Sequence, residues 1–311
     1  MISSKTRSSR LSKIYLNHNP NLLAMKYFAI PLLMGAVLCC TQAPAQKLEF
    51  KEHVSKEFTL TKSASANTLS IYNLNGSIKV EGYNGDKVIV EIDKTISAGT
   101  QDILAKGKQE FELGFDQKAD SITAYISNPF DSRPNRGRSN WNGPKIAYDF
   151  SLDFVVKVPF SMNLHVSTVN NGDVLVRNVT GRLIVRNVNG AIELVNAKGT
   201  TDAQTVNGNV IANYTAVPAE GSDFKTLNGD IKITYPPTLA ADCQFKSFNG
   251  EFFTDFPNTV SLPVKVVKNT ENEPGKTIFK LETETRIRIG SGGPLYRFET
   301  FNGNIYIKKQ S

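Results

Sequence analysis

The sequence predicts an all-β protein, a right-handed parallel β-helix (β-solenoid) of about 18–21 residues per coil with a loop-rich insertion. Three observations lead to this fold class. Nine-residue units that begin with Gly follow one another between residues 172 and 216, Asn-Gly pairs recur every 18 and then every 21 residues, and apolar residues stand at fixed places after each Gly. Self-similarity at a fixed period near twenty residues is typical of stacked repeats.

The Asn-Gly pairs indicate where each coil turns. Gly and Asn tolerate positive φ at low cost, so we expect them at sharp structural turns, and equivalent Asn side chains can hydrogen-bond along the stack. A hairpin meander also uses Asn-Gly, but it would not need identical faces in consecutive units. The turn residues are Asn75, Gly76, Asn171, Gly172, Asn189, Gly190, Asn207, Gly208, Asn228, Gly229, Asn249, Gly250, Asn302 and Gly303.

The residues two and four places after each turn glycine are predicted to fill the interior, because side chains two apart share one face of a strand. The first column comprises Ile78, Val174, Ile192, Val210, Ile231, Phe252 and Ile305. The second comprises Val80, Val176, Leu194, Ala212, Ile233, Thr254 and Ile307. Three aromatic side chains are expected to point outward: Tyr214, Phe253 and Tyr306.

The N-terminal part reads as a targeting segment. Residues 1–24 are interpreted as an upstream extension that is not native, and residues 25–45 as a signal peptide with an apolar run over 27–38. That run is too short for a transmembrane helix, so the mature chain is expected to have no transmembrane span. We expect export to the periplasm, the cell surface or the extracellular space, with a lipid-anchored form through Cys39 or Cys40 as the less favoured alternative.

The remaining chain divides into three predicted regions. Residues 46–97 form an N-terminal β coil or cap, residues 98–159 an insertion of strands and loops, and residues 160–311 the solenoid. Within them, a short helix is predicted over 102–109 and a loop or side hairpin over 256–283. The last unit, 286–307, is expected to close the array as its terminal coil.

Charge and cysteine content exclude several classes of protein. The chain has a formal net charge of +7, but residues 1–45 hold five of its 36 basic residues and no acidic one. Removing them leaves 31 basic against 29 acidic residues, a net charge of +2, which argues against nucleic acid as the partner. The mature chain keeps only Cys243, so no intramolecular disulfide is expected, and this thiol is predicted to be a small buried group.

Several segments resemble a known family. A Val-Pro strand end at 158–159, a Leu-x-Val-x-Thr run at 164–168, and repeated Thr/Asn-Val-Asn-Gly-x-Ile units resemble the bacterial putative-adhesin domain family of unknown function. The ending Gly-Gly-Pro-x-Tyr-x-Phe-x-Thr-Phe-Asn-Gly-Asn-Ile is similar to the closing coil of that family. The resemblance covers roughly 60–97 and 150–311, and it implies a secreted or surface-exposed β-solenoid without supplying catalytic residues. The doubled Asn170-Asn171 departs from the pattern by one residue.

The sequence contains no motif for a cofactor, a metal or a catalytic nucleophile. His53 and His165 lack partners at metal-ligand spacing, and the turns lack the Asp of calcium-binding nonapeptide repeats, so no metal and no cofactor are predicted. A polysaccharide-active enzyme on a β-helix is the alternative, and it would need acids gathered on one outer face. The candidate acids are Asp173, Glu193, Asp202, Asp230 and Glu251.

The long polar loop over 128–145 is the best candidate binding segment by composition. It contains Arg133, Arg136, Arg138 and Trp141, and Arg and Trp are enriched where protein partners bind. We therefore predict a secreted, non-enzymatic adhesin or envelope scaffold, with a cell-surface glycan or an envelope protein as its partner. A protein-partner module that binds through loop 128–145 is a further alternative.

Overall fold

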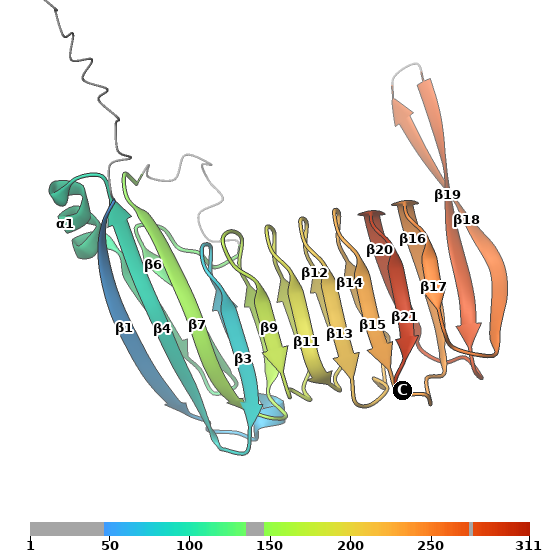
Figure 1. The fold of residues 1–311 in the computed structure, drawn as a ribbon, viewed down its shortest axis with the longest axis horizontal. Helices are drawn as coiled ribbons and strands as arrows, with labels where there is room; N and C mark the ends of the chain where they lie inside the picture. Colours follow the sequence, from blue (N-terminus) through green and yellow to red (C-terminus); the bar gives the residue numbers. More distant parts are fainter. Residues whose placement is uncertain (1–46, 135–145, 274–275) are drawn as a thin grey trace, which may run out of the picture. The chain divides into compact units, whose positions relative to one another are not determined.

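The computed structural model describes residues 47–134, 146–273 and 276–311, and only the backbone of 264–284. The all-β prediction is confirmed: two large mixed sheets account for most of the described chain. We name the ten-stranded sheet A and the eleven-stranded sheet B (Figure 1). No helix in the described ranges is long and apolar enough to cross a bilayer.

The strands of sheet A are, in spatial order, β1 (Leu48–Thr59), β4 (Lys87–Ala98), β7 (Asp149–Pro159), β3 (Ile78–Tyr83), β9 (Val174–Arg177), β11 (Ile192–Ala197), β13 (Val210–Tyr214), β15 (Ile231–Tyr235), β21 (Ile305–Lys309) and β17 (Phe252–Thr254). Those of sheet B are β18 (Thr259–Glu273), β19 (Lys276–Ile289), β16 (Ala241–Asn249), β20 (Leu295–Asn302), β14 (Asp223–Lys225), β12 (Thr201–Gln204), β10 (Leu183–Arg186), β8 (Asn163–Ser167), β2 (Thr68–Tyr72), β6 (Ser121–Asn128) and β5 (Glu112–Gln117).

From β8 to β15 the chain alternates strictly between the two sheets, and it turns from a strand of sheet B into one of sheet A at an Asn-Gly pair. We call such a pair of strands a layer. Neighbouring layers pair in parallel and without offset, as Val210 does with Ile192 on one side and Ile231 on the other. Both predicted apolar columns are in register and buried, except that Phe252 and Thr254 at one end are only partly buried.

The Asn side chains at the turns form a hydrogen-bonded ladder. The Nδ2 of each donates to the Oδ1 of its neighbour at 2.7–2.8 Å, in the order Asn249, Asn302, Asn228, Asn207, Asn189 and Asn170. Asn170, and not the predicted Asn171, stands in this ladder. Asn171 follows it with φ +58° and is the extra residue of the doublet.

A second set of bonds explains the Thr that precedes most ladder asparagines by two residues. The Oγ1 of Thr205 donates to the carbonyl oxygen of Gly190 at 2.8 Å, and that of Thr226 donates to Gly208 at 2.8 Å. In the same way, the Oγ1 of Thr168 donates to the carbonyl oxygen of Gly76, and that of Thr300 donates to Gly229. Most turns are therefore tied to the next by a hydroxyl as well as by an exposed amide, and in the layer of Asn189 the side-chain amide of Asn187 donates to the carbonyl oxygen of Gly172 instead.

The turn glycines are required mainly by close packing, which corrects the prediction that positive φ explains them. Only Gly76, Gly229 and Gly303 among the predicted turn glycines have positive φ. At Gly208, whose φ lies outside that region, a Cβ would overlap the carbonyl oxygen of Gly190 in the next layer. Glycine is therefore needed because stacked backbones touch where a side chain would stand.

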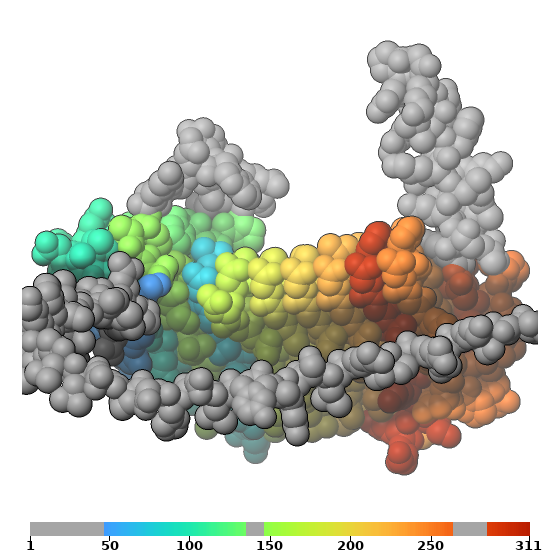
Figure 2. All heavy atoms as spheres, turned by 45° about the horizontal axis from the view of Figure 1, so that its top comes forward, coloured from blue at the N-terminus to red at the C-terminus, as the bar shows by residue number. Residues whose placement is uncertain are grey.

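The order of layers differs from the order of the sequence at the C-terminal end. The prediction that 286–307 forms the terminal coil is wrong, because β20 pairs with β14 and β16, and β21 pairs with β15 and β17. After β16 and β17, the chain forms the antiparallel hairpin β18–β19, and β19 pairs with the outer edge of β16. The chain then returns to form β20, which lies between β14 and β16. Figure 2 shows this return as a red band between gold and orange ones.

The N-terminal end is also rearranged. Strand β3 lies between β9 and β7 in sheet A, so residues 78–83 are closer to the repeating layers than residues 149–159, which come later in the sequence. Strands β4 and β1 continue sheet A beyond β7 as antiparallel strands. The predicted short helix is confirmed as α1 (Gln101–Glu110), which Thr100 caps by accepting a hydrogen bond from the backbone N–H of Ile103.

The interior becomes aromatic toward the C-terminal layers. Tyr214 is fully buried, which corrects its predicted outward position: it lies two and four residues after the inward-facing Ala212 and Val210 and so shares their face. Its ring stacks on Tyr235 at 4.9 Å, and its hydroxyl donates to Thr201. Cys243 is buried as predicted, and burial raises the pKa of its thiol to about 12, so it stays protonated at neutral pH.

The packing predicts opposite outcomes for two adjacent positions of β13. Val210→Asp should destabilise the protein by about 4 kcal/mol or more, because it buries a carboxylate without a partner. Ile211→Asp should cost less than about 1 kcal/mol, since Ile211 is 38% exposed. Denaturant unfolding of both variants measures the difference, and equal losses would contradict the assigned faces.

The buried hydroxyl bonds give a second prediction. Thr226→Val keeps the shape of the side chain but removes the donor to Gly208, so we expect a loss of about 1 kcal/mol in the free energy of unfolding. Thr226→Ser retains the hydroxyl and is the control for it. Thermal and urea unfolding should place the Ser variant closer to the wild type than the Val variant.

Candidate functional site

Of the four predicted binding residues in loop 128–145, Arg133 is the one that the structure describes, whereas Arg136, Arg138 and Trp141 lie outside the described residues. Its guanidinium bonds Asp116 through Nη1 at 2.6 Å and Asp131 through Nη2 at 2.6 Å. It also lies 3.8 Å from the centre of the Tyr125 ring. The hydrogen bond with Asp131 raises the pKa of the guanidinium. Arg133 therefore fastens the start of this segment to β5 and β6.

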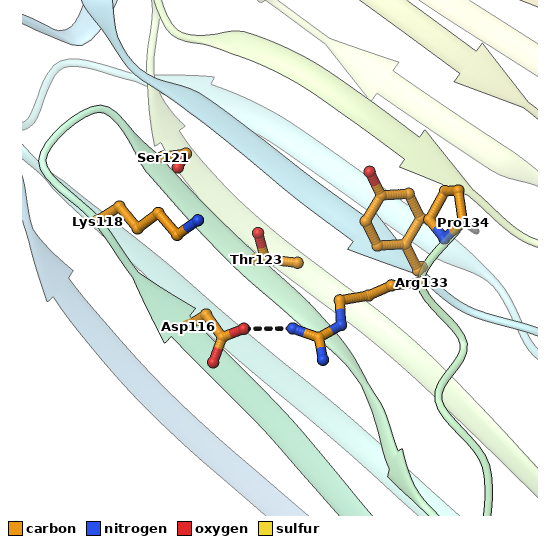
Figure 3. A pocket seen from close by; sticks show the side chains of 7 residues that line it. Asp116, Lys118, Ser121, Thr123, Arg133 and Pro134 are labelled. Carbon is orange, nitrogen blue, oxygen red and sulfur yellow. Dashed lines mark hydrogen bonds and ion pairs between the residues drawn. The ribbon is translucent and has the colours of Figure 1, made fainter. Parts of the chain in front are cut away.

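A polar hollow of about 270 Å³ adjoins Arg133, on the face of sheet B (Figure 3). Lys118 and the hydroxyls of Ser121 and Thr123 line it, together with Asp116 and Tyr72. Since two carboxylates already bind Arg133, Lys118 is the cation in this hollow that no described carboxylate pairs. Such a lining suits a small polar molecule held by hydroxyl and ammonium groups, with Arg133 as a fixed wall.

The five candidate acids do not gather on one face. Asp173 accepts a hydrogen bond from the backbone N–H of Ala191 at 2.7 Å, and Asp230 accepts one from Asn304 at 2.9 Å. Asp202 lies on β12 in sheet B and pairs with Arg186, whereas Glu193 is exposed on β11 in sheet A. Glu251 is exposed and directly precedes β17.

Asp173 and Asp230 therefore have a structural role within the stack. Each carboxylate accepts a hydrogen bond from a backbone N–H of the neighbouring layer, as the side-chain oxygen of an asparagine does in other layers. Burial opposes ionisation of Asp230, but the bonds from Asn304 and Lys232 outweigh it and lower the pKa of the carboxyl. Lys232 lies 2.9 Å from that carboxylate. An ionised and already bonded carboxylate suits a structural role better than a general acid.

The two histidines have unrelated surroundings. The ring of His53 on β1 bonds Asp93 and Glu91 of β4 at 2.7 Å each, and these hydrogen bonds raise the pKa of the imidazole. His165 lies on β8 with Nδ1 3.3 Å from the hydroxyl of Tyr72, and burial lowers its pKa. His53 thus joins two antiparallel strands, and His165 belongs to the face of sheet B.

Exposed aromatic pairs mark the C-terminal layers. The rings of Phe248 and Phe301 stack with centroids 4.8 Å apart and planes 6° from parallel. Phe248 is 74% exposed and Phe301 is 44% exposed. On the outer face of sheet A, Phe253 and Tyr306 stack at 5.0 Å and 11°. Two flat aromatic surfaces thus face outward from the same two layers.

Phe248 and Phe301 complete an apolar row beside the Asn ladder. The residue directly before each ladder asparagine is partly or fully exposed, and its size increases toward the C-terminal layers. We call these residues the aromatic row; they are, in spatial order, Val169, Val188, Val206, Leu227, Phe301 and Phe248. The change from Val to Leu to Phe before Asn-Gly is visible in the sequence, whereas the predicted apolar columns use only the positions after Gly.

Comparison with known proteins gives distant likenesses. No family model matches the chain, and no curated protein matches it. A solved structure described as a putative cell adhesion protein from Clostridium sporogenes is 11% identical, with 84% of this chain and 100% of that chain covered and a TM-score of 0.40. A putative lipid binding protein from Parabacteroides distasonis is 12% identical, with 83% and 97% covered and a TM-score of 0.33. A putative adhesin from Bacteroides fragilis is 10% identical, with 83% and 97% covered and a TM-score of 0.29.

The ion pairs of Arg133 predict a local effect on stability. Arg133→Lys cannot keep the forked bonds to Asp131 and Asp116, so the turn that follows β6 should open more often. Hydrogen exchange at the amide of Ser132, which donates to the carbonyl oxygen of Ile126, should become about tenfold faster. Lys118→Ala, in the same hollow, should leave this exchange unchanged; similar acceleration in both variants would contradict the anchoring role.

Proposed function

We propose that this protein is a secreted, non-enzymatic adhesin or envelope scaffold that binds its partner through the aromatic row. The observation that carries the proposal is Phe248, a large apolar side chain that is 74% exposed and stacked on Phe301, which is 44% exposed. Burying such rings against a partner recovers apolar free energy that the isolated chain leaves unused. The proposed partner is a cell-surface glycan or an envelope protein.

We further infer that the stacked layers form a right-handed parallel β-helix. The alternation between sheets, the parallel register of successive layers and the 18- to 21-residue spacing of the turns support this. The right-handed sense follows from the strong preference of connections between parallel strands of one sheet. Such a frame suits adhesion because its binding groups are held in a row at fixed spacing.

The geometry of the aromatic row favours binding over chemistry. Rings that already stack in parallel lose little conformational freedom when a ligand covers them, so they are pre-organised for binding. The exposed amides of Asn249 and Asn302 lie next to these rings in sequence and are 2.7 Å apart. By contrast, Asp173 and Asp230 are bonded to backbone N–H groups of neighbouring layers, which supports a non-enzymatic role.

The aromatic row is tested by a double variant, Phe248→Ser with Phe301→Ser. Binding of the labelled protein to bacterial cells and to purified envelope polysaccharides and proteins should fall at least about tenfold, because two exposed aromatic anchors are lost. Ile211→Ser, at a position 38% exposed on the outer face of sheet A, is the matched control and should bind as the wild type does.

Two results would overturn the proposal. Unchanged binding by the double variant would remove the aromatic row as the binding surface. Release of new sugar ends from a polysaccharide panel, abolished by Asp173→Asn or Asp230→Asn, would establish the enzymatic alternative instead. Near-native stability of each variant must accompany either conclusion, and the exposure of the two Phe rings predicts that the double variant retains it.

A further inference from the structure

A separate hollow of about 610 Å³ lies where the strands of sheet A end, away from the Asn-Gly turns that precede those strands. Its lining comes from the ends of β7, β9, β11 and β13 and comprises Phe160, Asn178, Thr180, Asn196, Lys198 and Thr215. Its volume lies within the range of about 300–1,000 Å³ typical of small-molecule sites. None of these six residues belongs to the aromatic row or to the hollow beside Arg133.

The hollow combines one aromatic side chain with amides and hydroxyls. Phe160 is 42% exposed, and its carbonyl oxygen accepts hydrogen bonds from the N–H and the Oγ1 of Thr180 at 2.7 and 3.1 Å. The backbone that carries the ring is thus fixed. An exposed ring held in this way presents an apolar surface to one side of a ligand.

The two asparagines are held in a conformation that non-glycine residues adopt rarely. Asn178 and Asn196 both have φ +56°, and the Nδ2 of Asn196 donates to the Oδ1 of Asn178 at 2.9 Å. Among the described residues this is the hydrogen bond that joins the two amides, and it uses neither the amide donors of Asn178 nor the amide oxygen of Asn196, so a ligand in the hollow can bond them. The backbone N–H of Asn178 is bonded to the carbonyl oxygen of Val195 at 2.9 Å, which fixes the corner.

Charge selects among polar ligands. Lys198 is the only charged residue that lines the hollow among the described residues, and no carboxylate of the described chain pairs with it. An anionic group can therefore bind its ammonium without displacing a protein partner. A ligand that fits has an apolar face for Phe160, hydroxyl groups for the amides and Thr side chains, and one carboxylate for Lys198.

We propose that this hollow binds a carboxylated pyranose unit of an acidic polysaccharide. The ring's C–H face would lie on Phe160, its hydroxyls would bond Asn178 and Asn196, and its carboxylate would pair with Lys198. The site is distinct from the aromatic row, so it adds a defined sugar class to the protein rather than resting on the proposed adhesive surface.

The test measures binding of two sugars to the full chain, trigalacturonate and its carboxyl-reduced, neutral counterpart. Calorimetry gives the affinities, and saturation-transfer NMR detects which sugar protons contact the protein. The wild type should bind trigalacturonate at least about tenfold more tightly than the neutral sugar. Lys198→Gln should remove this preference, whereas Phe160→Ala should weaken binding of both sugars. Asn178→Gly tolerates the positive φ and should weaken both without unfolding the corner.

The controls separate this proposal from the previous one. The double variant Phe248→Ser with Phe301→Ser should bind trigalacturonate as the wild type does, and Lys198→Gln should leave adhesion through the aromatic row intact. No binding of either sugar by the wild type, unchanged binding by Lys198→Gln, or equal competition by acetate would each overturn the carboxylated-sugar site. Loss of sugar binding in the double Phe variant would assign the sugar to the aromatic row instead.

Discussion

The structure depends on the close approach of backbone at the turns. Wherever Gly208 and its equivalents stack, the carbonyl oxygen of one layer occupies the place that a Cβ would take in the next. That approach brings Asn207 within hydrogen-bonding distance of both neighbouring asparagines and places Thr226 against the carbonyl of Gly208. The apolar columns stay in register because the turns cannot move apart without breaking both sets of bonds.

The same constraint decides which polar residues are available for function. An acid directly after a turn glycine lies beside a backbone N–H of the next layer, so Asp173 and Asp230 are bonded within the stack. The residue before the ladder asparagine contributes to the stack through its backbone, since the carbonyl oxygen of Val188 accepts a hydrogen bond from the N–H of Asn207 in the next layer, while its side chain lies at the surface. This position can therefore hold Val188 in one layer and Phe248 in another without affecting the register.

The sequence predicts the repeating part well because its causes are local. Period-two alternation after each glycine predicts the buried columns, and the short helix expected over 102–109 is found as α1. Order between layers is not local: the hairpin β18–β19 allows β20 to return between β14 and β16, and no spacing in the sequence records that choice. Tyr214 was misplaced although the alternation from Val210 gives its buried position.

The candidate sites were harder to predict because they arise from rows that cross the layers. Phe248 and Phe301 are 53 residues apart in the sequence, yet their rings stack because β20 pairs with β16. Phe160, Asn178 and Asn196 line one hollow because the neighbouring strands β7, β9 and β11 of sheet A end side by side. In a stacked fold we expect recognition to depend on the residues that vary between layers and not on the repeated ones, since the repeated residues are already bonded to one another.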